Sequence, residues 1–397
     1  MAAILEGIRI IDAGTVLAAP GSSTFLADFG AEVIKVEMPI TGDPIRRYPP
    51  HIKGQQLGSK VTNRNKFSVT LDLHQAPGRE VFRKLISKAD AVVLNYRLPT
   101  LKKWGLDYAD LIKVQPRLIM LHITGYGRTG PYANWPGFAR IAEAFSGLTY
   151  MSGYPDKGPM FPGYAIGDGI GGIYGALSLM LALYELKKSG TGQLIDLALY
   201  EPIMRILDDL YISHDVTGEI RERVGSINHV VSPSDIYRTK EGQWVVLPVS
   251  TPTMFRRLAE VIGHSELLDD ERFRTNSDRV RHRDELDQYI RPYLSEHTLD
   301  EILTEFRMHE IAVGPVNNVK QTMDDVHIHE RGSIESVWDP NLERYVRMQS
   351  VFPKLSKTPG AIRHPGPETG QDNDHIFRDL LQMSDTELVK LREGRVI

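Results

Sequence analysis

Residues 8–37 read IRIIDAGTVLAAPGSSTFLADFGAEVIKVE, and this stretch decides the fold. The apolar runs 8–11 and 33–36 are typical of buried strands, and residues 20–29 between them predict a short helix that ends at Gly30. A strand, a helix and a second strand in this order predict a parallel unit. The turn after the first strand lacks the G-x-G-x-x-G glycines that let a backbone approach a pyrophosphate, so a nicotinamide cofactor is not expected.

The same alternation continues along the first half of the chain. Strands are predicted at 68–71, 91–94, 118–123 and 195–198, and helices at 77–88, 101–104, 108–114 and about 169–188. Strands that alternate with helices at this spacing predict an α/β fold with a doubly wound, Rossmann-like parallel sheet.

The composition changes after about residue 210. We expect a first large domain over 1–210, a linker over 211–224 and a smaller α+β domain over 225–325. The small domain is indicated by a hairpin pattern at 235–248 and by charged amphipathic helices that follow it, one of which opens with the capping-box pair Thr298 and Glu301. Mixed structure resumes over 326–397, where Ser384 and Glu387 predict a last helix.

Composition excludes several classes of function. The 397 residues include no cysteine, which rules out thiolate catalysis, cysteine-ligated metals and disulfides. The net charge of -4 does not indicate a nucleic-acid partner. Residues 1–9 show no signal-peptide pattern, and the apolar stretch 170–183 is too short to span a bilayer. We therefore expect a cytoplasmic protein without a membrane partner.

The sharpest motif is GYAIGDGIGG at residues 163–172, in which Asp168 precedes an apolar helix. Asp168 could be a helix N-cap, because aspartate is a preferred cap. It could also be a carboxylate nucleophile, which neighbouring glycines would leave accessible and the helix N-terminus would favour. Two other spots read as ordinary structure: His122 as a satisfied polar group at a strand end, and residues 327–330, HIHE, as a solvated loop.

Several modest motifs occur in a specific order. They are LADFGAEVIKVE at 26–37, Gly42-Asp43 with Arg46, Asn65-Lys66, Gly125-Tyr126-Gly127, Gly130-Pro131-Tyr132, Gly167-Asp168-Gly169, GQLID at 192–196 with Glu201, and Gly314-Pro315-Val316. With these motifs, nearly the whole chain resembles the class III (family III) CoA-transferases. That superfamily contains formyl-CoA transferases, carnitine CoA-transferases and α-methylacyl-CoA racemases.

The resemblance implies a fold and a reaction. Residues 326–397 would return to the large domain, and two subunits would form a homodimer of interlocked rings. The implied reaction moves CoA from an acyl-CoA thioester to a free carboxylic acid through mixed-anhydride and aspartyl-CoA thioester intermediates. Asp168 aligns with the catalytic aspartate, and the reaction needs no metal and no cofactor beyond CoA as a substrate.

The resemblance also implies binding residues. The CoA contacts would be Arg46, Lys66, Asn95, Tyr96, Lys103 and Tyr126. The substrate pocket would include Leu17, Arg140, Gly167 and Gly169.

Departures from the family pattern narrow the substrate. Leu17 stands where formyl-CoA transferases have glutamine, and residues 250–253 replace their glycine run, which argues against formate and oxalate. Phe138 lies in the loop where racemases carry a catalytic histidine, and it cannot exchange a proton. Arg140 would suit a second carboxylate, so a C4–C5 dicarboxylic or related acid is expected. The alternatives are an α-methylacyl-CoA racemase and a non-catalytic CoA-binding protein.

Overall fold

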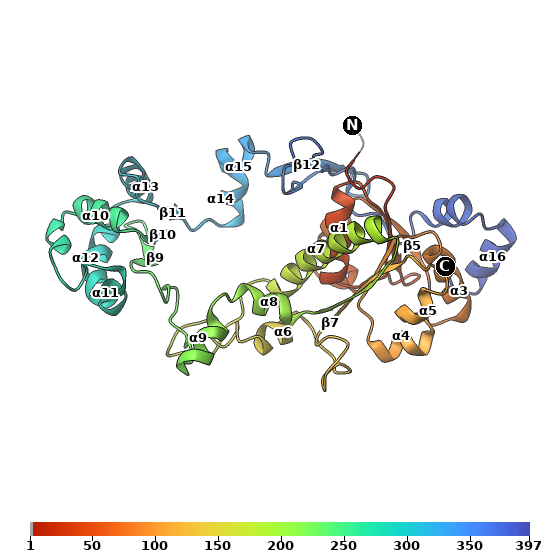
Figure 1. Cartoon of the computed structure of the whole chain (residues 1–397). Coiled ribbons are helices and arrows are strands. Elements are labelled where there is room, and N and C mark those ends of the chain that lie inside the picture. Colours follow the sequence, from red (N-terminus) through yellow and green to blue (C-terminus); the bar gives the residue numbers. More distant parts are fainter. Residues whose placement is uncertain (1–2) are drawn as a thin grey trace. The chain divides into compact units, whose positions relative to one another are not determined.

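The computed structural model describes residues 3–397 and divides the chain into two compact units (Figure 1). The first unit comprises Met1–Thr149, Pro162–Gly218 and His329–Ile397. The second comprises Tyr150–Phe161 and Glu219–Ile328. Each unit is described by itself below.

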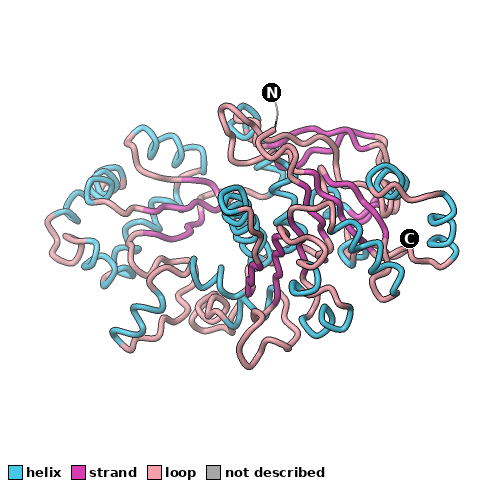
Figure 2. Tube along the Cα trace, turned by 45° about the vertical axis from the view of Figure 1, so that its right-hand side comes forward, coloured by secondary structure: helices cyan, strands magenta, loops and turns pink. Residues whose placement is uncertain are grey.

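A six-stranded sheet forms the centre of the first unit (Figure 2). Its order is β5-β2-β1-β6-β7-β8, and every neighbouring pair is parallel. The strands are β1 (Arg9–Asp12), β2 (Glu32–Glu37), β5 (Lys66–Thr70), β6 (Ala91–Leu94), β7 (Ile119–Thr124) and β8 (Leu194–Ala198). The prediction of a mixed α/β fold with a parallel sheet is confirmed.

Helices cover both faces of this sheet, as strands that are apolar on both sides require. In β6, Val92 and Leu94 belong to one core, whereas Ala91 and Val93 belong to the other. The first core is completed by α3 (Ala76–Ile86), α4 (Leu98–Trp104), α5 (Tyr108–Leu111), η3 (His375–Leu380) and α16 (Asp385–Glu393). The second core is completed by α1 (Ala18–Asp28), α6 (Ala139–Phe145), α7 (Ile166–Ser189) and α8 (Tyr200–Ile206).

The last part of the chain contributes to the first core. Ile376 and Phe377 are buried there, and α16 opens with the predicted reciprocal capping box of Ser384 and Glu387. The sequence did not predict the antiparallel hairpin of β12 (Ile334–Asp339) and β13 (Arg344–Gln349).

Shorter elements connect these parts. They are η1 (Pro44–Arg47), β3 (His51–Ile52), β4 (Gln55–Gln56), α2 (Leu57–Thr62) and α9 (Leu210–Thr217), which lies at the start of the expected linker. The segment with His327 and His329 is a short helix, α15 (Val326–Glu330), so the expected loop there is wrong.

The second unit has its own core under a small antiparallel sheet of order β11-β10-β9. The predicted hairpin is β9 (Ser234–Arg238) with β10 (Trp244–Pro248), and β11 is Gly314–Pro315. Its helical elements are α10 (Pro252–Val261), η2 (Ser265–Leu268), α11 (Asn276–Arg281), α12 (Arg283–Glu296), α13 (Leu299–Met308) and α14 (Val319–Asp324). The capping box of Thr298 and Glu301 opens α13, as predicted.

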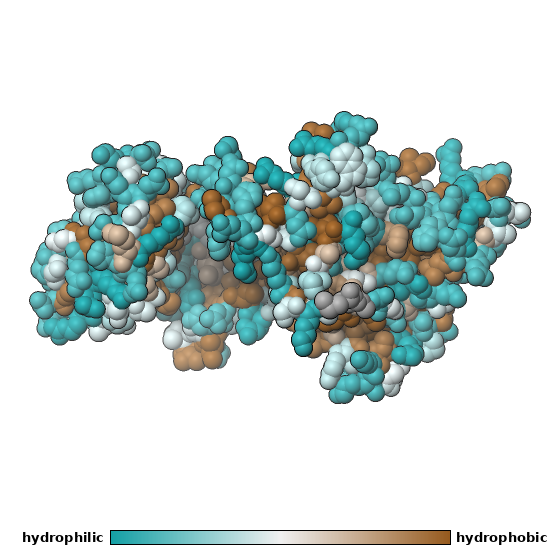
Figure 3. All heavy atoms as spheres, turned by 90° about the horizontal axis from the view of Figure 1, so that it is seen from above, coloured by the Kyte–Doolittle hydropathy of each residue, from teal (hydrophilic) through white to brown (hydrophobic). Residues whose placement is uncertain are grey.

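Helix α7 extends well beyond its most apolar stretch and has 24 residues. By length and composition alone it could cross a membrane, which corrects the expectation that this segment is too short. One face packs on α1 and β7 in the second core. The other face exposes Ile173, Leu177, Leu181 and Tyr184. On the face of the molecule that Figure 3 shows, brown apolar side chains lie among the hydrophilic ones.

Candidate active site

The sheet order places a ligand site between β1 and β6. The chain leaves β1 toward β2 on one side and later returns to β6 on the other side, so the topology switches at this point. Ligands of open parallel sheets bind in the crevice beyond the carboxyl ends of the strands at such a switch. Residues 15–18 follow β1 and residues 95–97 follow β6, and both segments line a cavity of about 380 Å³. This cavity is called the switch-point cavity below.

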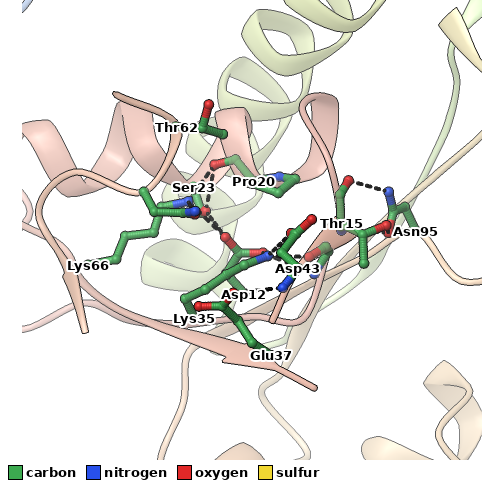
Figure 4. Close-up of polar contacts among 12 residues, drawn as sticks. Asp12, Thr15, Pro20, Ser23, Lys35, Glu37, Asp43, Thr62, Lys66 and Asn95 are labelled. Atoms are coloured by element: carbon green, nitrogen blue, oxygen red, sulfur yellow. Dashed lines mark hydrogen bonds and ion pairs between the residues drawn. The ribbon is translucent and has the colours of Figure 1, made fainter. Parts of the chain in front are cut away.

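Asn95 joins the two segments that line this cavity. Its side-chain carbonyl accepts the backbone N–H of Thr15 at 2.9 Å, and its amide donates to the Thr15 carbonyl, also at 2.9 Å (Figure 4). Tyr96 lines the same cavity, and burial raises the pKa of its hydroxyl to about 12, so it stays protonated. Asn95 and Tyr96 therefore both line the switch-point cavity, as expected for residues at the end of β6.

Asp168 lies in the first turn of α7, at the meeting point of two cavities. It lines the switch-point cavity and also a second cavity of about 220 Å³. Leu17 lines both cavities as well, and Gly169 lines the second. We call the second one the α1–α7 cavity, because residues of both helices line it.

The carboxylate of Asp168 is not used to cap the helix. The N-cap of α7 is Ala165, and within residues 3–397 the Asp168 carboxylate accepts no hydrogen bond. Burial, together with the negative charge of Glu143, raises the pKa of Asp168 to about 6. The N-cap interpretation is therefore wrong. A partly desolvated carboxylate without hydrogen bonds is well suited to act as a nucleophile.

The glycines around Asp168 serve mainly close packing. A Cβ on Gly167 would lie 3.2 Å from the Ala139 carbonyl oxygen, and one on Gly175 would lie 2.2 Å from the hydroxyl of Ser22 on α1. Gly163 and Gly169 face open space, with nothing within 4 Å of a Cβ built there. Gly167 thus lets α6 approach the start of α7, and Gly169 keeps the α1–α7 cavity open beside the carboxylate.

Two expected CoA contacts, Lys66 (Figure 4) and Arg46, are instead engaged in ion pairs within the protein. The Lys66 ammonium group is fully buried and donates to Asp12 at 2.8 Å and to the Pro20 carbonyl at 2.7 Å. Arg46 forms a bidentate ion pair with Glu37, with both N···O distances 2.7 Å. Their positive charges are compensated inside the protein, which gives both residues a structural role.

The two remaining expected CoA contacts, Lys103 and Tyr126, line neither cavity. Lys103 is exposed in the last turn of α4 and lines neither cavity described above. Tyr126 belongs to an aromatic cluster, with ring centroids 5.8 Å from Tyr132 and 6.2 Å from Trp135. Trp135 lines the switch-point cavity, so Tyr126 supports a lining residue from behind.

Arg140 is placed differently from the expectation. It lines neither the switch-point cavity nor the α1–α7 cavity. Its guanidinium donates to the Glu143 carboxylate at 2.9 Å and to the Pro162 carbonyl at 3.0 Å. The Arg140 guanidinium is therefore engaged with Glu143 and Pro162 within the protein.

The residues considered for proton transfer lie as follows. Phe138 lines the switch-point cavity and offers no base. His122 is fully buried, with Nε2 2.7 Å from the Tyr96 carbonyl and Nδ1 2.9 Å from Arg128, and burial lowers its pKa. The interpretation of His122 as a satisfied polar group is confirmed. Within residues 3–397, no three His, Asp or Glu side chains are grouped as a metal site would need.

Sequence reasoning missed Arg97 and Glu143. Arg97 lines the switch-point cavity, and its place directly after Asn95-Tyr96 at the end of a strand was a usable signal. Glu143 is fully buried beside Asp168. The one signal for it in the sequence was its i,i+3 spacing from Arg140, which suits an ion pair on one helix turn.

Residues 5–373 match the family described as CoA-transferase family III, and the chain belongs to this family. It is 40% identical over 396 residues to the succinyl-CoA–L-malate CoA-transferase beta subunit of Chloroflexus aurantiacus, a match that covers 99% of this chain and 98% of the relative. It is 39% identical over 394 residues to the succinyl-CoA–D-citramalate CoA-transferase of the same organism, covering 99% and 98%. The crystal structure of a CAIB/BAIF family protein from Brucella suis superimposes with a TM-score of 0.85 at 29% identity, covering 96% and 100%.

Proposed function

We propose that this protein transfers CoA between dicarboxylic acids, with Asp168 as the covalent nucleophile. The observation that carries the proposal is the position of Asp168. Its carboxylate accepts no hydrogen bond from the described residues and lines both the switch-point cavity and the α1–α7 cavity. One cavity can hold the CoA thioester and the other the acid, with the same carboxylate within reach of both.

The proposed reaction balances without an external reagent. The Asp168 carboxylate attacks the thioester carbonyl, which forms a mixed anhydride and releases CoA thiolate. The thiolate attacks the Asp168 carbonyl of the anhydride, which gives an aspartyl-CoA thioester and frees the donor acid. The acceptor carboxylate then attacks this thioester, which releases CoA thiolate and forms a second mixed anhydride. The thiolate attacks the acceptor carbonyl of that anhydride, which forms the new acyl-CoA and restores the Asp168 carboxylate.

The site residues of this proposal follow from the cavities. We assign the CoA chain to the switch-point cavity, with Asn95, Tyr96 and Arg97 as contacts. Arg97 brings a positive charge that suits the anionic part of CoA. We assign the acid to the α1–α7 cavity beside Leu17 and Gly169. Its apolar Leu17 favours a longer carbon chain over oxalate, which needs hydrogen bonds to all its oxygens.

The names of the two relatives guide the choice of substrates. We propose succinyl-CoA as the donor and L-malate or D-citramalate as the acceptor, which are C4 and C5 diacids as expected from the sequence. The test is a screen of free acids for CoA acceptance from succinyl-CoA, read by mass spectrometry of the acyl-CoA products. Transfer to formate or oxalate in preference to these diacids would refute the substrate assignment.

The racemase alternative is weaker because Phe138 stands where a base is required. A racemase would exchange the α-proton of a 2-methylacyl-CoA with solvent deuterium, whereas the proposed transferase would not. A non-catalytic CoA-binding protein would bind CoA and show neither activity.

We further propose that the chain works in the cytoplasm as an interlocked homodimer, with 1–210 and 326–397 forming the large domain and 225–325 the small one. The exposed apolar face of α7 supports association, because single chains rarely expose a row of large apolar side chains. Sedimentation of the purified chain should give twice 44.7 kDa. One relative is named a beta subunit, so assembly with a different subunit is the competing arrangement. A chain that stays monomeric until a different subunit is added would refute the homodimer.

A further inference from the structure

The segment just before Asp168 is held by a buried carboxylate on a neighbouring helix. Glu143 lies on α6 and is fully buried. Its Oε1 accepts the backbone N–H of Gly167 at 3.0 Å, and its Oε2 accepts Nη1 of Arg140 at 2.9 Å. The two oxygens of one carboxylate thus connect an arginine to the residue next to Asp168.

The bond to Gly167 matters because the first N–H groups of a helix have no partner within the helix. Ala165, the N-cap of α7, supplies no side-chain hydrogen bond. Glu143 supplies an acceptor from outside the helix instead. Gly167 makes this possible, since a Cβ there would lie 3.4 Å from the Glu143 Cγ and 3.2 Å from the Ala139 carbonyl oxygen. The bond fixes the turn that carries Asp168.

The charge of Glu143 has a second effect on Asp168. A buried carboxylate near another carboxylate disfavours the ionised form of both, and the nucleophile must be ionised to attack. Arg140 offsets this charge through an ion pair that is buried on the glutamate side. Removing Arg140 would leave the Glu143 charge uncompensated beside the nucleophile.

Other charged and titratable groups face Asp168 from different elements. Asp28 of α1 and Arg64 line the α1–α7 cavity, but they neutralise each other in an ion pair with a 2.6 Å contact. Tyr164 lines that cavity too, and Tyr96 and Arg97 line the switch-point cavity. None of these groups contributes to the raised pKa of Asp168, whose causes are burial and the negative charge of Glu143.

We propose that Arg140 and Glu143 form a positioning pair for the nucleophile: Glu143 holds the backbone before Asp168, and Arg140 offsets the negative charge that Glu143 presents to it. This inference rests on the proposed function, because it requires Asp168 to act as a carboxylate. It assigns Arg140 to the nucleophile and not to the distal carboxylate of a diacid.

The test is the pH profile of kcat/KM for CoA transfer from succinyl-CoA to L-malate, measured for the full chain. For Arg140→Met, we expect the acidic limb to move up by about one pH unit, which is about a tenfold loss of rate at pH values below the limb. Arg140→Lys should keep the limb near its original position. Glu143→Gln keeps an acceptor for the Gly167 N–H but removes the negative charge, so it should move the acidic limb to lower pH. The double variant Arg140→Met/Glu143→Gln should show the same shift to lower pH as Glu143→Gln.

The matched control is Arg274→Met, which removes the arginine of the exposed i,i+3 pair with Glu271 and should leave the limb in place. Unmoved limbs in both Arg140→Met and Glu143→Gln would overturn the proposal. A rise in KM for diacids at every pH, with the limb unmoved, would also overturn it and return Arg140 to substrate binding. If Arg140→Met does not fold, Glu143→Gln tests the proposal alone, and an unmoved limb in that variant would overturn it.

Failure of the proposed function is distinguishable from failure of this inference. Asp168→Asn is assayed in parallel. Transfer that survives in Asp168→Asn refutes the nucleophile, whereas an inactive Asp168→Asn together with unmoved limbs refutes only the positioning pair.

Discussion

The backbone N–H of Val16 donates to the buried carboxylate of Asp43 at 3.0 Å, and Val16 itself lies at a φ of 69°. Positive φ is costly for a β-branched residue, so this backbone persists only where its surroundings hold it. Lys35 completes the support, because its ammonium group donates to Asp43 at 2.8 Å and to the Gly14 carbonyl. The loop that lines the switch-point cavity is therefore held from inside the protein.

Asp43→Ala should destabilise the protein strongly. It leaves buried Lys35 with Asp12, at 3.8 Å, as its remaining ion-pair partner among the described residues, and it frees the Val16 N–H. Breaking a buried ion pair from one side costs about 3–5 kcal/mol. Urea unfolding measures the free energy directly, and the exposed Asp324→Ala, which removes the pair with Lys320, is the control with an expected cost below about 1 kcal/mol. Equal small losses in both variants would contradict the role of Asp43.

Asp168→Asn should make the protein more stable at neutral pH. The folded pKa of Asp168, about 6, lies above its ordinary value of 3.8. The folded state therefore binds the proton more tightly, and the ionised carboxylate costs stability at pH 7 that disappears as the pH falls toward 4. We expect a gain of about 1–3 kcal/mol at pH 7 and almost none near pH 4. A loss of about 1 kcal/mol at pH 7, as removal of an N-cap would give, would contradict the geometry.

The pH dependence of transfer follows from the same carboxylate. Because Asp168 must be ionised to attack, kcat/KM should fall as the pH drops through about 6, by about tenfold for each further pH unit. Initial rates of acyl-CoA formation between pH 4.5 and 8 measure this limb, with circular dichroism at each pH to confirm that the chain stays folded. Full activity maintained to pH 4.5 would exclude Asp168 as the group that titrates.

Gly175→Ala tests the close packing of α7 on α1. A methyl group there would lie 2.2 Å from the Ser22 hydroxyl and 3.0 Å from its Cβ, so α1 and α7 must separate. We expect a loss of about 1–3 kcal/mol in thermal or urea unfolding. Gly169→Ala is the matched control on the same helix, because its methyl group meets nothing within 4 Å and alanine favours the helix by up to about 1 kcal/mol. If both variants lost the same stability, the glycines would not serve packing.

Much of the fold could be predicted because its signals are local. The apolar run at 91–94 and the capping pairs Thr298–Glu301 and Ser384–Glu387 each depend on neighbouring residues, and the structure has all three elements. The hairpin of β12 and β13 was missed because its strands expose charged and aromatic side chains in place of a clear apolar alternation. Helix α15 was missed because it has only five residues.

The site was harder to predict because its partners are far apart in the chain. Lys66 and Arg46 were expected to contact CoA, because its phosphates are anionic and need cationic partners. Their acidic partners, Asp12 and Glu37, come from other strands, so only the folded sheet shows that the charges are buried. Asp168 could be singled out from its glycine setting, whereas its relation to Glu143 required the packing of α6 against α7.

The central claim is that Asp168 exchanges its carboxylate oxygen with the substrate acids. In the proposed reaction, the bridging oxygen of the second anhydride comes from the acceptor acid and stays on Asp168 when the thiolate departs with the acyl group. The measurement is incubation with succinyl-CoA and L-malate labelled with oxygen-18 in its carboxylates, followed by mass spectrometry of the peptide that contains Asp168. We predict one heavy oxygen on Asp168 after a single turnover and up to two after many, because each turnover replaces one of its two equivalent oxygens. We predict none on Glu143, and no labelling when succinyl-CoA is left out. Turnover that leaves Asp168 unlabelled would contradict the claim.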